Sequence, residues 1–342
     1  NGEALQTPGF LQGMPYPEYL EKMIATKVAP CPGGVITPDT FRAWEALEVG
    51  AIPLVDTHGG RGLVDAYWPN LLRREIPFPV IEDWAEAPNH VQRLLAGWPY
   101  HANRIESWWG IWKRDFVYRF FDDLRSFAEP VKRPGDRVTV LVPTSSIPSH
   151  PSTAMIETVL HSVLDRPELS GCEVIVMCDG LREQHKERAA AYEEYIRRLH
   201  RLCKQWKNVL VLVFDKPMHQ SGMTSEALKH VRTPAVFFVE HDTPLTGEIP
   251  FEQLVDAVLS HADVVRLHHE VMVLRPHAHL MPDHQRTEGE RAFCEVKDVA
   301  GLPMVRTVQW SQRPHMASTG FYRQIIAAHF DNQRNPMFIE DR

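Results

Sequence analysis

The sequence predicts an α/β protein built around a parallel sheet that helices cover on both faces. Near-continuous apolar runs, typical of buried parallel strands, recur between residues 138 and 239. Helical patterns, with apolar residues three and four apart, separate these runs. The last run, Ala235–Val239, ends abruptly in two acids, Glu240 and Asp242. Because an open α/β sheet binds its ligand at the carboxyl ends of its strands, this stretch predicts where the ligand lies.

The first unit, residues 1–95, is predicted to contain a βαβ arrangement. Lys27–Ala29 is strand-like and leads into a turn rich in proline and glycine. A helix capped by Thr37 then covers residues 38–49 until a glycine ends it. Ala51–Val55 is the next buried strand.

Three blocks of this unit are similar, in order and spacing, to the C-terminal lobe of exostosin-like GT-B glycosyltransferases: Cys31–Gly34, Thr40–Pro53 and Ile76–Trp84. The resemblance implies that the helix over residues 38–49 lies beside the donor nucleotide and that Glu45 contacts the nucleotide sugar. A GT-B enzyme uses two Rossmann lobes, and the sequence shows one. The unit is therefore expected to be a partial GT-B-like α/β lobe, and a role as a scaffold stays open.

Residues 96–130 are expected to form a helical connector that is rich in tryptophan. Its aromatic residues recur at helical spacing: Trp98, Trp108, Trp109, Trp112, Phe116, Phe120 and Phe121. Such residues predict core or interdomain packing, with a sugar-binding platform as the alternative. A turn at residues 132–136 marks the start of a further domain, residues 131–342.

This further domain is expected to be a Rossmann-like nucleotide-binding domain. Its predicted strands alternate with helices and cover Val138–Val142, Val174–Cys178, Val209–Val213 and Ala235–Val239. A short helix over Ser225–Val231 precedes the last strand, after a loop at Met218–Ser225. Polar residues follow three of the strands: the Thr144–Ser152 loop, Asp179, and Glu240 with Asp242. The carboxyl ends of parallel strands share one edge, so these groups are expected to converge on a single ligand.

An acid-x-Asp sequence after a hydrophobic strand, with this spacing upstream, resembles the DxD signature of GT-A glycosyltransferases over residues 137–270. The resemblance implies that Pro143 and Thr144 flank the uracil or other base and that Asp179 hydrogen-bonds the base or ribose. It implies further that Glu240 and Asp242 meet ribose and metal, with Asp242 the stronger metal ligand.

The sequence departs from the GT-A pattern at the first acid, which is glutamate, and this leaves open which acid touches the metal. His241, between the two acids, is expected to point away from them if the strand continues, as a packing residue. Two carboxylates on alternate residues suit a hard cation, Mn²⁺ or Mg²⁺, that would hold a diphosphate.

Later residues complete the expected site. GT-A enzymes commonly bring a late histidine to the metal and a basic residue to the diphosphate, which implies roles for His315 and Arg313. Glu340 and Asp341 resemble the xED motif of inverting GT-A enzymes, which implies that Asp341 is the general base, with Glu340 as the second choice. A histidine cluster at positions 268, 269, 277, 279 and 284 is expected to be a polar loop near the acceptor, with zinc binding as the alternative.

Composition restricts the class of protein. A hydrophobic fraction of 44% and a charged fraction of 24% are those of an ordinary globular protein, and 342 residues suggest about two domains. The five cysteines are widely spaced, which indicates neither disulfides nor a structural zinc site. No apolar run is long enough for a membrane span and no signal peptide is evident, so a cytoplasmic protein is expected, of bacterial or bacteriophage type. Because the chain begins at Asn1 rather than Met, it is expected to be part of a longer protein.

The predicted function is that of a metal-dependent, inverting glycosyltransferase that uses a nucleotide-sugar donor, most simply a UDP-sugar. A surface glycan is the expected acceptor, and hydroxymethylated phage DNA is the alternative. A net charge of −7 gives no general attraction to DNA, although eight Lys and Arg against four Glu lie between Arg182 and Lys207. Two other classes stay open: a sugar-nucleotide nucleotidyltransferase, and a non-catalytic binding or assembly module.

Overall fold

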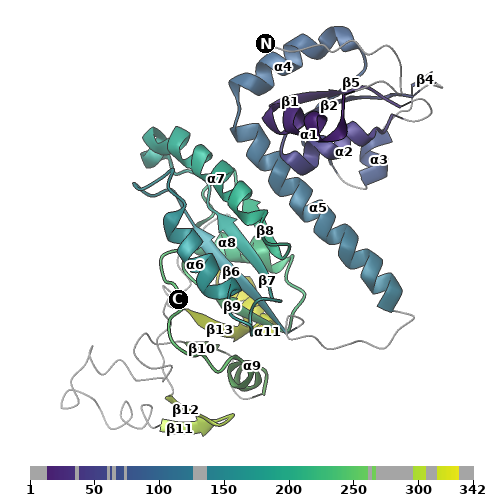
Figure 1. The fold of residues 1–342 in the computed structure, drawn as a ribbon. Helices are drawn as coiled ribbons and strands as arrows, with labels where there is room; N and C mark the ends of the chain where they lie inside the picture. The colour runs from purple at the N-terminus through teal and green to yellow at the C-terminus, as the bar shows by residue number, and fades with distance from the viewer. Residues whose placement is uncertain are drawn as a thin grey trace. The chain divides into compact units, whose positions relative to one another are not determined.

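The chain forms two compact units, Asn1–Tyr118 and Arg119–Arg342, in the computed structural model (Figure 1). The structure describes residues 14–34, 38–59, 62–63, 67–72, 75–125, 137–260, 264–266, 296–305 and 314–330. Each unit has its own parallel strands and its own buried apolar core. None of the described helices combines the length and the apolar composition that crossing a membrane requires.

The first unit is built on a small sheet. Its strands run parallel in the order β1 (Val28–Cys31), β2 (Ile52–Asp56) and β5 (Val80–Ile81). Helix α2 (Phe41–Val49) connects β1 to β2, which confirms the predicted βαβ arrangement. The helix begins later than expected, because Thr40 rather than Thr37 caps it, accepting a hydrogen bond from the Arg42 backbone N–H. Gly50 ends the helix with φ 77°, a left-handed conformation that glycine adopts without strain.

The remaining described elements of the first unit surround this sheet: α1 (Tyr16–Ala25), β3 (His58–Gly59), β4 (Gly62–Leu63), α3 (Tyr67–Leu72), a 3₁₀ turn (Trp84–Glu86), α4 (Ala87–Ala96) and α5 (Tyr100–Arg125). In the tryptophan-rich α5, Trp109 is buried with its ring centroid 5.8 Å from that of Trp44. Its indole N–H donates to Glu48, and that of Trp112 donates to the Leu72 carbonyl. These tryptophans are therefore packing groups of the first unit.

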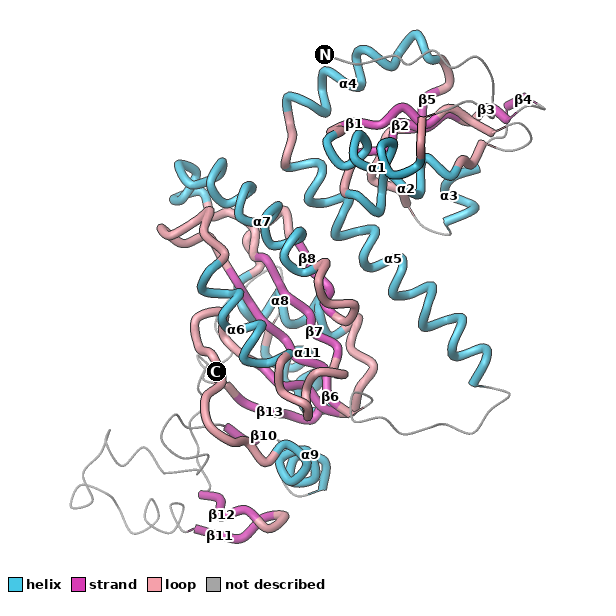
Figure 2. Tube along the Cα trace, viewed as in Figure 1, coloured by secondary structure: helices cyan, strands magenta, loops and turns pink. Residues whose placement is uncertain are grey.

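The second unit contains a six-stranded sheet in the order β10-β13-β9-β6-β7-β8 (Figure 2). The four predicted strands are present and parallel: β6 (Val138–Thr144), β7 (Glu173–Cys178), β8 (Val209–Val213) and β9 (Ala235–Phe238). Every residue of β6 and β9 is buried, as their apolar composition predicts. Beyond β9 lie β13 (His315–Ser318), which is antiparallel to both of its neighbours, and β10 (Val264–Arg266).

Helices cover both faces of this sheet. One face packs against α6 (Ala154–Leu164), α7 (Ala189–Cys203) and α9 (Phe251–Ser260). The other packs against α8 (His219–Leu228) and α11 (Thr319–His329). A 3₁₀ segment (Glu183–Arg188) precedes α7, and β11 (Val296–Val299) pairs with β12 (Leu302–Val305) as a hairpin. Because the chain moves from β6 outward to β8 and then returns to the other side of β6, the carboxyl ends of β6 and β9 flank the switch point of the sheet.

Two sequence predictions about this unit are wrong. Helix α8 was expected over Ser225–Val231 after a loop, but it starts at His219 and ends at Leu228. Ser221, Gly222 and Thr224 are weak helix formers, yet all three are buried, so tertiary packing overrides local preference. The sheet is also mixed rather than purely parallel, because β13 enters it in the opposite direction.

Candidate functional site

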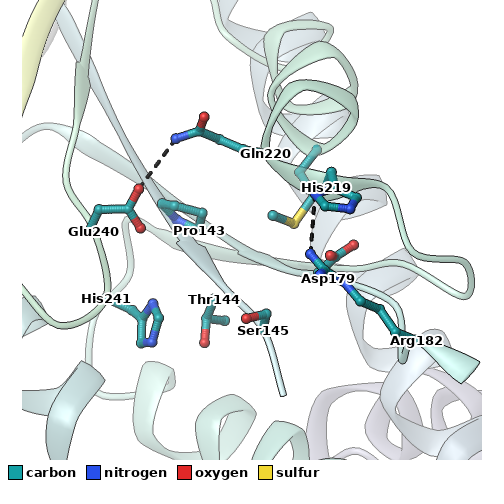
Figure 3. Close-up of a pocket in the computed structure, with 10 residues that line it drawn as sticks. Pro143, Thr144, Ser145, Asp179, Arg182, His219, Gln220, Glu240 and His241 are labelled. Atoms are coloured by element: carbon teal, nitrogen blue, oxygen red, sulfur yellow. Dashed lines mark hydrogen bonds between the residues drawn. The ribbon is translucent and has the colours of Figure 1, made fainter. Parts of the chain in front are cut away.

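A pocket opens at the carboxyl ends of β6, β7 and β9 and beside the first turn of α8 (Figure 3). Its empty volume, including the part open to solvent, is about 430 Å³. The lining residues are mostly polar: Pro143, Thr144, Ser145, Asp179, Arg182, His219, Gln220, Met223, Glu240 and His241. The structure thus brings together four of the residues expected from the sequence, namely Pro143, Thr144, Asp179 and Glu240, although they are spread over about 100 positions of the chain.

Pro143 and Thr144 are the last residues of β6. The Thr144 hydroxyl is buried and lies 3.1 Å from the hydroxyl of Tyr195 on α7, so its side chain belongs to the floor of the pocket. The Thr144 carbonyl accepts a hydrogen bond from the Asp179 backbone N–H, 2.9 Å away. This bond continues the pairing of β6 with β7 and fixes where Asp179 emerges from the sheet.

Asp179 follows β7 and is 2% exposed. Its Oδ1 accepts two backbone hydrogen bonds, from Gly180 at 2.9 Å and from Met218 at 2.6 Å. No described residue donates a hydrogen bond to Oδ2. Burial raises the pKa of Asp179, while the two backbone N–H groups and the nearby positive charge of Arg182 oppose the rise.

Gly180 allows the Asp179 loop to approach the segment that follows β8. A Cβ atom at position 180 would lie 2.2 Å from the Lys216 carbonyl carbon, so any other residue would force the two backbones apart. The close approach brings the Met218 N–H onto Asp179. The glycine therefore helps to shape the pocket, although it is not one of the lining residues.

Glu240 lies two residues beyond the end of β9. Its Oε1 accepts a hydrogen bond of 3.3 Å from Gln220 Nε2, across the pocket (Figure 3). His241 also lines the pocket, so the expectation that it points away is wrong. The strand ends at Phe238, and residues 241 and 242 are in a turn where the alternation of strand side chains no longer holds. Burial lowers the pKa of His241.

Asp242 is exposed beside the pocket and is not among its lining residues. Its Oδ1 accepts a hydrogen bond from the hydroxyl of Thr243, 3.2 Å away. Within the described ranges, no three His, Cys, Asp or Glu side chains gather closely enough to hold a metal ion by themselves. The donor set does fit Mg²⁺ or Mn²⁺ in another way, because such cations are often held by one or two carboxylates together with substrate phosphates and water. Glu240 and Asp242 would supply those two carboxylates.

His315 lies in the core on β13 and is 1% exposed. Its Nε2 is hydrogen-bonded to the Tyr322 hydroxyl, and its ring stacks on Phe238 with centroids 5.1 Å apart. It does not line the pocket. Binding of a metal through Nε2 would require His315 to release Tyr322.

The other expected residues cannot be compared with the pocket. Arg313, Glu340 and Asp341 lie outside the described residues, as does the histidine cluster at positions 268 to 284. Glu45 belongs to the first unit, on α2, where its carboxylate accepts a 2.8 Å hydrogen bond from the Tyr19 hydroxyl.

The sequence does not single out four of the lining residues, namely Arg182, His219, Gln220 and Met223. A signal for them was available, because the segment after Val209–Val213 follows a fourth parallel strand and therefore reaches the same edge of the sheet. The sequence pattern predicts this segment, Met218–Ser225, as a loop without a functional role. His219 also has a left-handed backbone, with φ 55°, which no sequence pattern predicts.

Comparison with known proteins gives distant structural likenesses. No protein-family model matches the sequence, and no curated protein sequence does. A 4-diphosphocytidyl-2C-methyl-D-erythritol synthase from Anaerococcus prevotii is 12% identical with a TM-score of 0.32, over 58% of this chain and 81% of that one. The mannosyltransferase PcManGT from Pyrobaculum calidifontis, in complex with GDP-Man and Mn²⁺, is 17% identical with a TM-score of 0.29, over 49% and 46%. TarS from S. aureus is 19% identical with a TM-score of 0.32, over 54% and 47%.

This chain therefore spans somewhat less than half of the latter two proteins. At such TM-scores the likenesses assign no activity to it.

Proposed function

We propose that this chain is a metal-dependent glycosyltransferase that moves a sugar from a UDP-sugar to a hydroxyl acceptor with inversion. The observation that carries the proposal is the convergence of Thr144, Asp179 and Glu240, from three strand ends, on one polar pocket at the switch point of the sheet. A chance acid-x-acid turn would not gather polar groups from the ends of two other strands. The pocket belongs to the second unit, which we propose to be a GT-A domain.

The proposed donor lies with its base near Pro143 and Thr144 and its base or ribose against Asp179. Glu240 meets the ribose and, with Asp242, holds Mn²⁺ or Mg²⁺. The charges of the pocket support a cation, because its lining has two carboxylates and one guanidinium, and a diphosphate brings further negative charge. When bound, the cation would neutralise the charge that develops on the departing diphosphate.

The proposed chemistry needs a base for the acceptor and a positive charge for the leaving group. Asp341, with Glu340 as the second choice, is proposed to accept the proton of the attacking hydroxyl, since a sugar hydroxyl is a weak nucleophile. Arg313 is proposed to stabilise the diphosphate, and His315 to be a further metal ligand. In the first unit, Glu45 is the proposed nucleotide-sugar contact of an exostosin-like lobe.

A glycan is the proposed acceptor. DNA is less favoured because basic residues near α7 are already paired with neighbouring acids: Lys186 with Glu183, and Arg198 with Glu194. Binding of a hydroxymethylated duplex that weakens steeply with salt would reverse this choice of acceptor.

The proposal can be tested by measuring the affinity of the intact chain for UDP by calorimetry, with and without Mn²⁺. The measurement compares the unaltered protein with Asp242→Asn. We expect binding that depends on Mn²⁺ and an affinity loss of at least about tenfold in the variant, because a metal carboxylate is lost. Glu248→Gln is the matched control, since it removes an exposed carboxylate from the same loop outside the pocket.

Equal binding without metal, or none at all, would reject the proposed function and favour a non-catalytic module. The product separates the remaining enzyme classes. Release of UDP from a UDP-sugar supports the glycosyltransferase, whereas release of pyrophosphate from UTP and a sugar phosphate would indicate a nucleotidyltransferase.

A further inference from the structure

The segment Met218–Gln220, which comprises the N-cap and the first two residues of α8, contacts all three charged residues that line the pocket. The Met218 backbone N–H donates to Asp179 Oδ1 at 2.6 Å. Arg182 Nη2 lies 3.2 Å from His219 Nδ1, and Gln220 Nε2 donates to Glu240 Oε1 at 3.3 Å. Three consecutive residues thus bind three groups that emerge from the ends of two different strands. Figure 3 shows the contacts of His219 and Gln220.

The backbone at His219 makes this arrangement possible. Its φ of 55° is left-handed, a conformation that costs a side chain free energy because Cβ crowds the following carbonyl group. Among the described residues, Ala300 is the other non-glycine residue with a positive φ, and it lies in the β11–β12 turn. The change of chain direction at His219 lets the Met218 N–H and the Gln220 side chain reach different walls of the pocket. Strain kept at a pocket, where a glycine would relieve it, indicates that the side chain has a role there.

The bond between Arg182 and His219 has a direction. A guanidinium can only donate, so His219 Nδ1 is the acceptor and the ring proton is on Nε2. No described residue accepts a hydrogen bond from Arg182 Nε or Nη1. Arg182 forms no direct ion pair with Asp179, although its charge acts on that carboxylate. The unused N–H groups of Arg182 and the Asp179 Oδ2 atom therefore stay available to a ligand.

We propose that Met218–Gln220 is the positioning element of the pocket and that His219 is a positioning residue that aims Arg182 at the nucleobase. The inference rests on the proposed function and deepens it by naming a further contact of the base, Arg182, and the residue that orients it. A phosphate group next to Arg182 would also meet the carboxylate of Asp179, so this side suits a neutral group with adjacent donor and acceptor atoms, as on the edge of a nucleobase. The diphosphate and its cation then belong to the Glu240 side.

The test measures calorimetric dissociation constants for UDP with Mn²⁺, and for UMP without metal, in variants of position 219. His219→Asn keeps an acceptor and tolerates the left-handed backbone, so its affinity is expected within about threefold of the unaltered chain. His219→Gly relieves the strain and removes the acceptor, so both ligands should bind about tenfold more weakly while the melting temperature does not fall.

Arg182→Met should produce the same loss, and the double variant His219→Gly with Arg182→Met should lose no more than either single variant. Additive losses, or a His219→Gly variant that binds both ligands as tightly as the unaltered chain, would overturn the inference and leave the proposed function standing. A loss confined to UDP would also overturn it, because it would place His219 at the diphosphate end. If the unaltered chain does not bind UDP, the proposed function fails and the inference fails with it.

Discussion

Asp56 in the first unit and Asp179 in the second arise from the same sequence pattern, an apolar parallel strand that ends in aspartate. Both are buried, with 3% and 2% of their surface exposed. Asp56 is the last residue of β2 and Asp179 follows β7, and each of these strands is parallel to its neighbour. Their hydrogen bonds differ. That difference separates a residue that holds the fold from one that is free to bind a ligand.

Asp56 uses both of its carboxylate oxygens within the protein. Oδ1 accepts from the backbone N–H groups of Gly33 and His58, at 3.2 and 3.1 Å. Oδ2 accepts from Gly33 at 3.2 Å and from the indole of Trp84 at 2.6 Å. Asp179, in contrast, binds two backbone N–H groups through Oδ1 and leaves Oδ2 to the pocket. A strand-end acid therefore indicates a ligand site only where the surrounding loops leave part of it unused.

Replacement of each aspartate by asparagine should separate the two roles most clearly. In Asp56→Asn the new NH₂ group must face at least one of the present donors, so the free energy of unfolding should fall by about 2 to 4 kcal/mol. In Asp179→Asn the carbonyl oxygen can keep both backbone bonds, so stability should change by less than about 1 kcal/mol. Urea unfolding followed by tryptophan fluorescence suits Asp56→Asn, because seven of the nine tryptophans lie in the first unit, at positions 44, 68, 84, 98, 108, 109 and 112, and circular dichroism adds the signal of the second unit for Asp179→Asn.

Nucleotide binding should show the opposite order. Asp179→Asn turns an acceptor in the pocket into a donor, so the affinity for UDP should fall at least about tenfold, whereas Asp56→Asn should leave it unchanged under conditions where the protein is folded. Equal losses of stability in the two variants would show that the geometry of the carboxylates does not distinguish their roles.

The stability of the second unit should depend on pH through His150. This residue lies behind the pocket, and 8% of its surface is exposed. Its ring stacks on Tyr195 with centroids 3.8 Å apart. Burial, with smaller contributions from the charges of His241 and Arg188, lowers the pKa of His150 from 6.5 to about 4.

Between these two pKa values the unfolded chain binds a proton at His150 that the folded chain does not, so stability rises with pH. The contribution is complete above about pH 6.5 and is lost as the pH falls toward 4, by about 3 kcal/mol in total. Urea unfolding followed by circular dichroism across this range checks it. The free energy of unfolding should change less steeply with pH in His150→Gln, which has no ring to protonate. An identical pH dependence in both proteins would assign the acid sensitivity to other groups.

Much of the second unit is predictable from its sequence because the relevant signals are local. The runs Val138–Val142 and Ala235–Val239 are apolar enough to be buried on both faces, and their order along the chain implies the shared edge on which Thr144, Asp179 and Glu240 meet. The antiparallel β13 depends on pairing with β9, about 80 positions earlier in the chain, and that pairing leaves no pattern in a single short strand.

The first turn of α8 was missed for a related reason. Local preference favours a loop at Ser221, Gly222 and Thr224. These residues are buried in the folded unit, and this tertiary packing stabilises the helix instead. The left-handed His219 at its start has no sequence signal either. The same limit explains why Asp56 and Asp179 look alike in sequence. Their roles are set by backbone N–H groups that loops bring from 23 and 39 positions away, those of Gly33 and Met218.

Gln220 tests whether Glu240, the carboxylate that we propose to bind the donor, needs support from within the protein. Gln220→Met keeps a side chain of similar length but removes the donor to Glu240 Oε1, so Glu240 gains freedom that binding must then remove. The affinity for UDP with Mn²⁺ should fall by about threefold to tenfold, which corresponds to about 1 kcal/mol. Gln253→Met on the exposed side of α9 is the matched control and should have no effect.

Because Gln220 contacts the Glu240 side of the pocket, the affinity for UMP without metal should change less than that for UDP with Mn²⁺. The reverse order would mean that Glu240 binds the nucleoside rather than the cation, and that the metal depends on Asp242.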